Sequence, residues 1–212
     1  MQVSSLIAPA IIAAVLGAAT AVIAVFFKLL MKRDERKPEP KLDTSLLRAS
    51  VMCMGVKNVA PDEAKYEGFP TCASAKPFFE GPKGCKLGCI GLGDCAAACP
   101  AKAIDICNGL AIVDRNKCTG CGVCRDACPQ HIIRLYPKSQ TVLPLCSSKE
   151  PAERKVDLCA AGCTACGACI AICPFGAIAV KGTVARIDAE KCVSCGKCAE
   201  VCPRKCIAVF QI

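Results

Sequence analysis

The sequence predicts an α+β protein in which one apolar N-terminal helix precedes two copies of a small cysteine-rich module. Three observations support this prediction. Of the 212 residues, 22 are cysteine and only 4% are aromatic, which leaves little material for an ordinary hydrophobic core. The first 27 residues carry no charged side chain. When the sequence is shifted so that Cys85 falls on Cys159, eight cysteines coincide with eight others.

The N-terminal segment is long enough to cross a bilayer. Residues 6–27 are all apolar or small and would span about 33 Å as a helix. A signal peptide would begin with basic residues, whereas here Lys28, Lys32 and Arg33 follow the apolar stretch. Their positive charge predicts that the remainder faces the cytoplasm. We therefore expect residues 1–31 to form a single-pass anchor in the lipid bilayer of the cell (inner) membrane.

The rest of the chain divides by composition and by the repeat. Residues 32–84 combine a charged, proline-bearing tether with a lead-in that contains two cysteines. The first module is expected over residues 85–137, a connector over 138–158 and the second module over 159–212. Within each module a short hairpin is expected, around Asn108-Gly109 in the first and around Lys181-Gly182 in the second.

Two cysteine runs in the second module share the spacing C-x2-C-x2-C-x3-C-P. One runs from Cys163 to Cys173, and the other from Cys192 to Cys202. This spacing is typical of bacterial ferredoxins, in which three close thiolates hold one 4Fe–4S cluster and the fourth reaches the neighbouring cluster. Zinc ribbons pair two C-x2-C knuckles and need no fourth cysteine before proline. The predicted modules are therefore ferredoxin-like and carry two clusters each.

The first module departs from this spacing. Leu92 occupies the position that matches Cys166, and Cys85 stands four residues before Cys89. Either Cys85 replaces the missing ligand of a 4Fe–4S cluster, or the site is a 3Fe–4S centre with three cysteines. We favour the replacement, because a thiolate stands one short loop away.

Four 4Fe–4S clusters follow from these runs. Their expected ligand sets are Cys85, Cys89, Cys95 and Cys128; Cys99, Cys118, Cys121 and Cys124; Cys163, Cys166, Cys169 and Cys202; and Cys173, Cys192, Cys195 and Cys198. The chain contains no P-loop, nicotinamide fingerprint or catalytic triad, so we assign no catalytic residue.

Six cysteines stand outside these sets. Cys107 and Cys206 lie in apolar, strand-like stretches and are expected to be small buried hydrophobes. The other four provide the hypothesis of a fifth cluster, although their separations form no tight motif: Cys53, Cys72, Cys146 and Cys159.

The formal net charge of +9 would suit an anionic partner such as nucleic acid. Sixteen thiolates set against four oxidised cluster cores would reduce it to roughly +1. Because aromatic side chains for stacking on bases are scarce, we expect no nucleic-acid partner and rank a structural zinc or nucleic-acid-binding protein last.

The arrangement of anchor, tether and two dicluster modules resembles the B subunits of Rnf complexes. The resemblance is carried by GPKGCKLGCIGLGDCAAACP at residues 81–100, by YEGFPTC at residues 66–72 and by LCSSK at residues 145–149. It is close from about Val51 to the end of the sequence and loose over the N-terminal segment. That family commonly has a further C-x2-C-x4-C module after the anchor, whereas this chain passes from Leu47 to Cys53 without one. Either this is a short form, or its electron path near the membrane differs.

The resemblance implies an electron-transfer subunit of an ion-translocating ferredoxin:NAD⁺ oxidoreductase, which is not catalytic alone. Such a subunit would accept electrons from reduced ferredoxin and pass them to other membrane subunits. The alternative is an anchored polyferredoxin-type subunit of another membrane oxidoreductase, a hydrogenase or a formate dehydrogenase.

Overall fold

The computed structural model describes residues 43–63, 65–79 and 81–211. Residues 43–212 form a compact second unit, separate from residues 1–42. The expected membrane anchor over residues 1–31 lies outside the described residues. Within the described residues, no helix combines the length and the apolar character that crossing a membrane requires.

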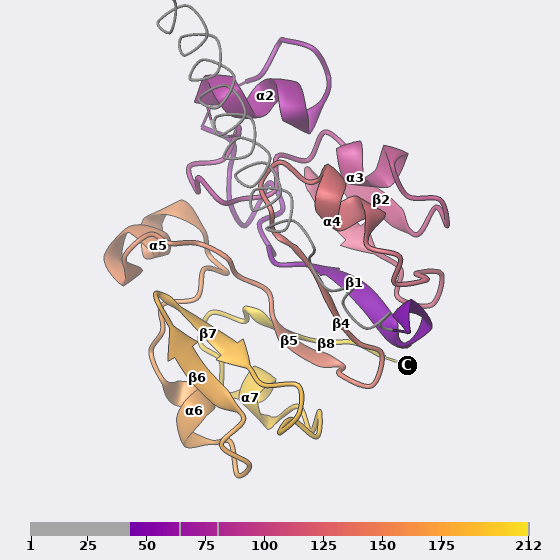
Figure 1. Cartoon of the computed structure of the whole chain (residues 1–212). Coiled ribbons are helices and arrows are strands. Elements are labelled where there is room, and N and C mark those ends of the chain that lie inside the picture. Colours follow the sequence, from indigo (N-terminus) through magenta and orange to yellow (C-terminus); the bar gives the residue numbers. More distant parts are fainter. Residues whose placement is uncertain (1–42, 64, 80, 212) are drawn as a thin grey trace, which may run out of the picture. The chain divides into compact units, whose positions relative to one another are not determined.

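Two modules of the same mixed α/β design make up the second unit (Figure 1). Each contains a one-turn helix, a two-stranded hairpin, a second one-turn helix and a final strand. In the first module these elements are α3 (Asp94–Ala97), β2 (Ile104–Cys107), β3 (Leu110–Val113), α4 (Val123–Ala127) and β4 (Ile133–Pro137). In the second they are α6 (Ala168–Ala171), β6 (Ile178–Lys181), β7 (Val184–Ile187), α7 (Lys197–Glu200) and β8 (Ile207–Val209). The shift that superposes the cysteines also superposes the start of each element on that of its counterpart.

The two hairpins occupy equivalent positions. In the first, Cys107 pairs with Leu110 across the turn at Asn108-Gly109, where both residues have positive φ. In the second, Lys181 pairs with Val184, so the turn is Gly182-Thr183. This turn lies one residue later than the sequence predicts, because Gly182 provides positive φ at the first turn position, where Asn108 stands in the first hairpin.

A lead-in strand pairs with the final strand of each module. Strand β1 (Leu47–Val51) follows the short helix η2 (Thr44–Leu46) and runs antiparallel to β4, while β5 (Val142–Pro144) runs antiparallel to β8. Val51 pairs with Ile133, and Pro144 pairs with the equivalent Ile207. The two lead-in strands are therefore farther apart along the chain than the final strands with which they pair.

The segment between the lead-in strand and the module is longer in the first half of the second unit than in the second half, because the first half contains an insertion. It contains helix α2 (Cys72–Phe79), whereas the shorter second lead-in contains helix α5 (Ala152–Leu158). Asp94 joins α2 to the first module: its carboxylate accepts hydrogen bonds from the backbone N–H of Cys72 at 2.7 Å and of Ala73 at 2.9 Å.

Cysteines form much of the buried interior of both modules. The core of the first module combines aliphatic residues such as Ile104 and Ile132 with Cys89, Cys95 and Cys124. The core of the second has the same character. Cys206 is buried, as the sequence predicts. Cys107 is exposed, contrary to expectation, because only the first residue of β2 faces the interior.

Candidate iron–sulfur sites

Four one-turn helices position the third cysteine of each run. Each helix follows a glycine in the left-handed conformation, with φ of 93°, 82°, 82° and 81° at Gly93, Gly122, Gly167 and Gly196. Glycine adopts this conformation without steric cost, so the chain reverses directly before the cysteine. The cysteine two residues later is buried in every case.

Twenty of the 22 cysteines gather in five groups of four, which we number as sites 1 to 5. Cys107 and Cys206 belong to no group, although Cys206 also lines the cavity of site 4. Site 1 contains Cys99, Cys118, Cys121 and Cys124; site 2, Cys72, Cys89, Cys95 and Cys128; site 3, Cys53, Cys85, Cys146 and Cys159; site 4, Cys163, Cys166, Cys169 and Cys202; and site 5, Cys173, Cys192, Cys195 and Cys198. The members of sites 2 to 5 line one cavity each. Counting space open to solvent, these cavities measure about 360, 440, 370 and 320 Å³.

The thiols of each group interact electrostatically. Burial, together with the charges of the nearby Cys89, Cys128 and Cys72, raises the pKa of Cys95 to about 12. Burial likewise raises the pKa of Cys159 to about 11, with the other three members of site 3 as additional causes. In site 1 the pKa of Cys124 rises to about 11 for the same two reasons.

Sites 1, 4 and 5 bring together the same cysteines that the sequence predicts. Each receives three cysteines from one C-x2-C-x2-C segment and one cysteine from the Cys-Pro end of the other run. Backbone N–H groups also point at ligand sulfurs: Ala103 N lies 3.4 Å from Cys99 Sγ, and Ala185 N lies 3.4 Å from Cys163 Sγ. Such donors favour the charged thiolate that iron requires.

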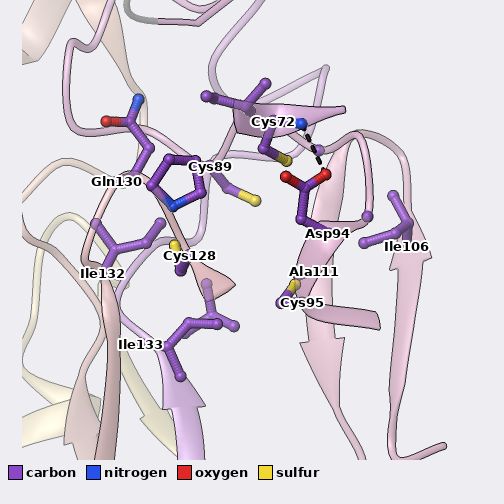
Figure 2. A pocket seen from close by; sticks show the side chains of 15 residues that line it. Cys72, Cys89, Asp94, Cys95, Ile106, Ala111, Cys128, Gln130, Ile132 and Ile133 are labelled. Carbon is purple, nitrogen blue, oxygen red and sulfur yellow. Dashed lines mark hydrogen bonds between the residues drawn. The ribbon is translucent and has the colours of Figure 1, made fainter. Parts of the chain in front are cut away.

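Site 2 differs from the prediction in one member. Figure 2 shows the sulfur atoms of Cys72, Cys89, Cys95 and Cys128 around one space, with Cys72 contributed by the inserted helix α2. The backbone N–H of Leu92 interacts with the Cys72 thiol, so Cys72 approaches the loop where the repeat lacks its cysteine. The insertion in the first module thus brings a fourth thiol to the group in which Leu92 replaces the cysteine of the repeat.

Cys85, expected in that set, lies in site 3 instead. It lines the same cavity as Cys53, Cys146 and Cys159, and both Cys53 and Cys146 act on its thiol. Three of the four cysteines named for a fifth cluster therefore share this cavity, and Cys72 and Cys85 exchange places relative to the expected sets. The physical reason is that α2 packs against the loop before Cys95, held there by Asp94, and so takes the position that Cys85 would need.

Site 3 joins the two modules through equivalent positions. Cys53 and Cys146 each stand two residues beyond the end of a lead-in strand, and Cys85 and Cys159 each stand four residues before the first cysteine of a run. Each module therefore contributes one pair of thiols from matching places. Met52 N donates to Ile132 O at 2.7 Å and Leu145 N to Cys206 O at 2.8 Å, which fixes both lead-in segments in the same way.

The donor chemistry of these sites suits multi-iron clusters. Among the described residues, no three His, Cys, Asp or Glu side chains are arranged to bind one metal ion together. In a 4Fe–4S cluster each thiolate binds a different iron, so four cysteines spread around a cavity meet the requirement. Four thiols around each of several cavities of similar size therefore fit clusters of that kind.

Comparison with known proteins agrees with this chemistry. Residues 117–177 and 162–206 match the 4Fe-4S dicluster domain family. The second of these matches contains all the cysteines of sites 4 and 5, and the first extends from site 1 into the second module.

Three curated relatives extend the similarity to about two thirds of the chain. The chain is 42% identical to the B subunit of the Na(+)-translocating ferredoxin:NAD(+) oxidoreductase complex of Acetobacterium woodii, over 68% of this chain and 43% of that protein. It is 37% identical to the B subunit of the ion-translocating oxidoreductase complex of Methanosarcina acetivorans, over 66% and 54%. It is 38% identical to the B subunit of the proton-translocating ferredoxin:NAD(+) oxidoreductase complex of Clostridium ljungdahlii, over 66% and 50%. This chain is a homologue of the B subunits of Rnf complexes.

The chain spans about half the length of these Rnf relatives. The chain contains a tandem 4Fe–4S dicluster region, as the sequence predicts. The members that sequence reasoning misplaced, Cys72 and Cys85, stand outside any regular spacing. One signal in the sequence could have predicted the lead-in strand before them. Residues 47–51 alternate apolar and polar side chains, which is the pattern of a half-buried strand.

Proposed function

We propose that this chain is the electron-relay subunit of an Rnf-type complex and holds five 4Fe–4S clusters, one at each of sites 1 to 5. The cysteine thiolates of each site would bind the four irons, and the clusters would supply one-electron transfer. In this proposal the subunit accepts electrons from reduced ferredoxin and passes them to membrane partner subunits for NAD⁺ reduction coupled to ion translocation. The chain itself contributes no catalytic residue to that reaction.

The order of the five sites carries the proposal. The charge of Cys124 in site 1 raises the pKa of Cys95 in site 2, and the charge of Cys53 in site 3 raises the pKa of Cys89 in site 2. On the other side, Arg186 interacts with both Cys146 of site 3 and Cys163 of site 4. Sites 4 and 5 are linked in turn, because Cys169 acts on Cys198. Neighbouring sites are thus close throughout, which supports a continuous path for electrons.

Exposure of the ligands supports entry and exit at the two ends of this path. Cys121 of site 1, Cys195 of site 5 and Cys166 of the adjoining site 4 are exposed, whereas no cysteine of site 2 or site 3 is. A partner protein could approach the terminal sites closely, while sites 2 and 3 stay within the relay. We propose that ferredoxin docks at one terminal site and that a membrane partner takes electrons from the other.

The membrane placement also belongs to the proposal. The apolar residues 6–27 and the basic residues after them support an anchor over residues 1–31, with the modules on the cytoplasmic side. Lipid and the membrane subunits of the complex would then be neighbours of the chain.

Anaerobic purification of the full-length chain from its native membrane tests the proposal. We expect about twenty iron atoms and twenty sulfides per chain, given four of each for every site. We also expect reduced ferredoxin to bleach the visible absorbance of the bound clusters, and mass spectrometry to identify co-purifying Rnf subunits. A preparation containing zinc and no sulfide would refute the relay. Hydrogenase or formate dehydrogenase subunits as the only partners would assign the relay to another oxidoreductase.

A further inference from the structure

Two lysines are buried in the wall of site 3. Lys83 is 5% exposed and Lys155, on helix α5, is 1% exposed. Both line the cavity that Cys53, Cys85 and Cys146 share with Cys159. Lysine rarely occurs so deeply buried unless an anion accompanies it, because removing an ammonium group from water is costly.

The two lysines make equivalent contacts although they are not equivalent in the repeat. Lys83 Nζ donates to the carbonyl oxygens of Cys89 at 2.6 Å and Gly109 at 2.7 Å. Lys155 Nζ donates to the carbonyl oxygens of Cys163, at 2.9 Å, and Thr183. The repeat relates the acceptors, Cys89 to Cys163 and Gly109 to Thr183, but it relates Lys83 to Asp157. Two different lead-in segments therefore bring an ammonium group to the same place in each module.

No carboxylate accompanies either lysine among the described residues. Neither takes part in an ion pair there, and no Asp or Glu lines the cavity of site 3. Glu63 lies beside Gly84 and Glu150 is paired with Arg154, both outside the cavity wall. Each ammonium group has three N–H donors, of which the carbonyl oxygens take two. The anions left to compensate the two lysines are thiolates: those of site 3 and, beyond its wall, Cys89 of site 2 beside Lys83 and Cys163 of site 4 beside Lys155.

In the part of the chain that the structure describes, none of the cavities of sites 2, 4 and 5 has two buried lysines in its wall. Asp94 is the one ionisable residue besides cysteine in the wall of site 2, and Arg204 and Lys197 are single cations in the walls of sites 4 and 5. Lys197 is exposed, so water screens its charge. In site 3, by contrast, two arginines also donate to the carbonyl oxygens of ligands: Arg186 to Cys146 at 2.8 Å and Arg204 to Cys159 at 2.6 Å.

We propose that Lys83 and Lys155 hold site 3 close to electrical neutrality and thereby give it the highest reduction potential of the five sites. This inference rests on the proposed function, because it concerns the cluster that the site would bind. Four thiolates, an oxidised core of about +2 and two ammonium groups sum to roughly zero. One electron arriving from a neighbouring site adds a single negative charge, with no bond formed or broken. Buried positive charge favours that reduced state, so electrons collect where the two modules meet.

Neutral replacement of the lysines tests this inference. Lys83→Gln and Lys155→Gln remove the charge and keep an N–H donor for the carbonyl oxygens, and Lys65→Gln is the matched control because the Lys65 side chain is 86% exposed. The full-length chain is titrated with redox mediators while reduced clusters are followed by electron paramagnetic resonance. Cys159→Ser and Cys166→Ser identify the signals of site 3 and site 4.

In the wild type, the first signal to appear as the potential falls should be the one that Cys159→Ser alters. At a fixed potential, each Gln variant should lower the ratio of reduced to oxidised site 3 by roughly tenfold, equivalent to about 59 mV for one electron. The double variant should lower it further, and Lys65→Gln should leave it unchanged. The inference would be overturned if the first signal to appear were the one that Cys166→Ser alters. It would also be overturned if the Gln variants kept their full iron content and the titration of site 3 did not shift.

If the Gln variants lose iron, variants that keep the positive charge provide a second comparison. Lys83→Arg and Lys155→Arg keep the charge, so they should retain about twenty irons and an unshifted site 3. Loss of site 3 iron in the Arg variants as well would overturn the inference, because shape and not charge would then matter. The titration uses artificial mediators, so it does not depend on ferredoxin. Iron-free wild-type chain would instead refute the proposed function.

Discussion

The exchange of Cys72 and Cys85 yields a prediction that distinguishes the sequence-based ligand sets from those of the structure. Cys72→Ala should leave site 2 with three thiolates, so that it loses either one iron or the whole cluster. Iron per chain should fall from about 20 to between about 16 and 19. Cys85→Ala should cause a loss of the same size at site 3, so the iron count alone cannot separate the two assignments.

Leu92→Cys separates them. The repeat aligns Leu92 with Cys166, and the Leu92 backbone N–H interacts with the Cys72 thiol, so a cysteine at position 92 lies beside the vacated ligand position. The added cysteine should restore about 20 irons to the Cys72→Ala variant and should not rescue Cys85→Ala. Iron and sulfide analysis, with electron paramagnetic resonance for 3Fe–4S centres, measures the outcome. Rescue of Cys85→Ala, with none for Cys72→Ala, would refute the assignment of site 2.

Three further changes test the supporting structure. Asp94→Ala should release the start of α2, cost about 1–2 kcal/mol and reproduce the iron loss of Cys72→Ala, whereas Asp94→Asn should retain most of the iron. Arg115→Met should lower the free energy of unfolding by about 2–3 kcal/mol in denaturant titrations, because the Arg115 guanidinium donates to Ser50 Oγ at 2.9 Å and to Gln140 O at 3.0 Å. The control Arg125→Met should leave the free energy of unfolding almost unchanged, because the Arg125 side chain is exposed. Gly196→Ala should cost about 1–2 kcal/mol of stability, because the φ of Gly196 is 81°. Gly120→Ala should also displace η2 and β1 and release iron from site 1, because a β-carbon at residue 120 would collide with the carbonyl oxygens of Thr44 and Leu47. Equal iron retention by the two variants would contradict this difference.

Local spacing made much of this architecture predictable. A C-x2-C-x2-C segment brings three thiolates to one place through a single loop, so sites 1, 4 and 5 follow from residues close together in the chain. The repeat also predicts both hairpins, although Gly182 moves the second turn by one position. The gap at Leu92 indicated that one ligand must come from elsewhere, but the sequence favoured Cys85, which stands nearer to Leu92 along the chain than Cys72 does.

The sequence by itself determined the chemistry and the number of modules, because thiolate spacing and the repeat are local properties of the chain. Only the tertiary structure decided which distant cysteines meet. Cys53 and Cys146 lie far apart in the sequence and share a cavity because each lead-in strand pairs with the final strand of its own module. Site 3 and its two buried lysines likewise arise where the modules pack together, and no spacing along the chain encodes that contact.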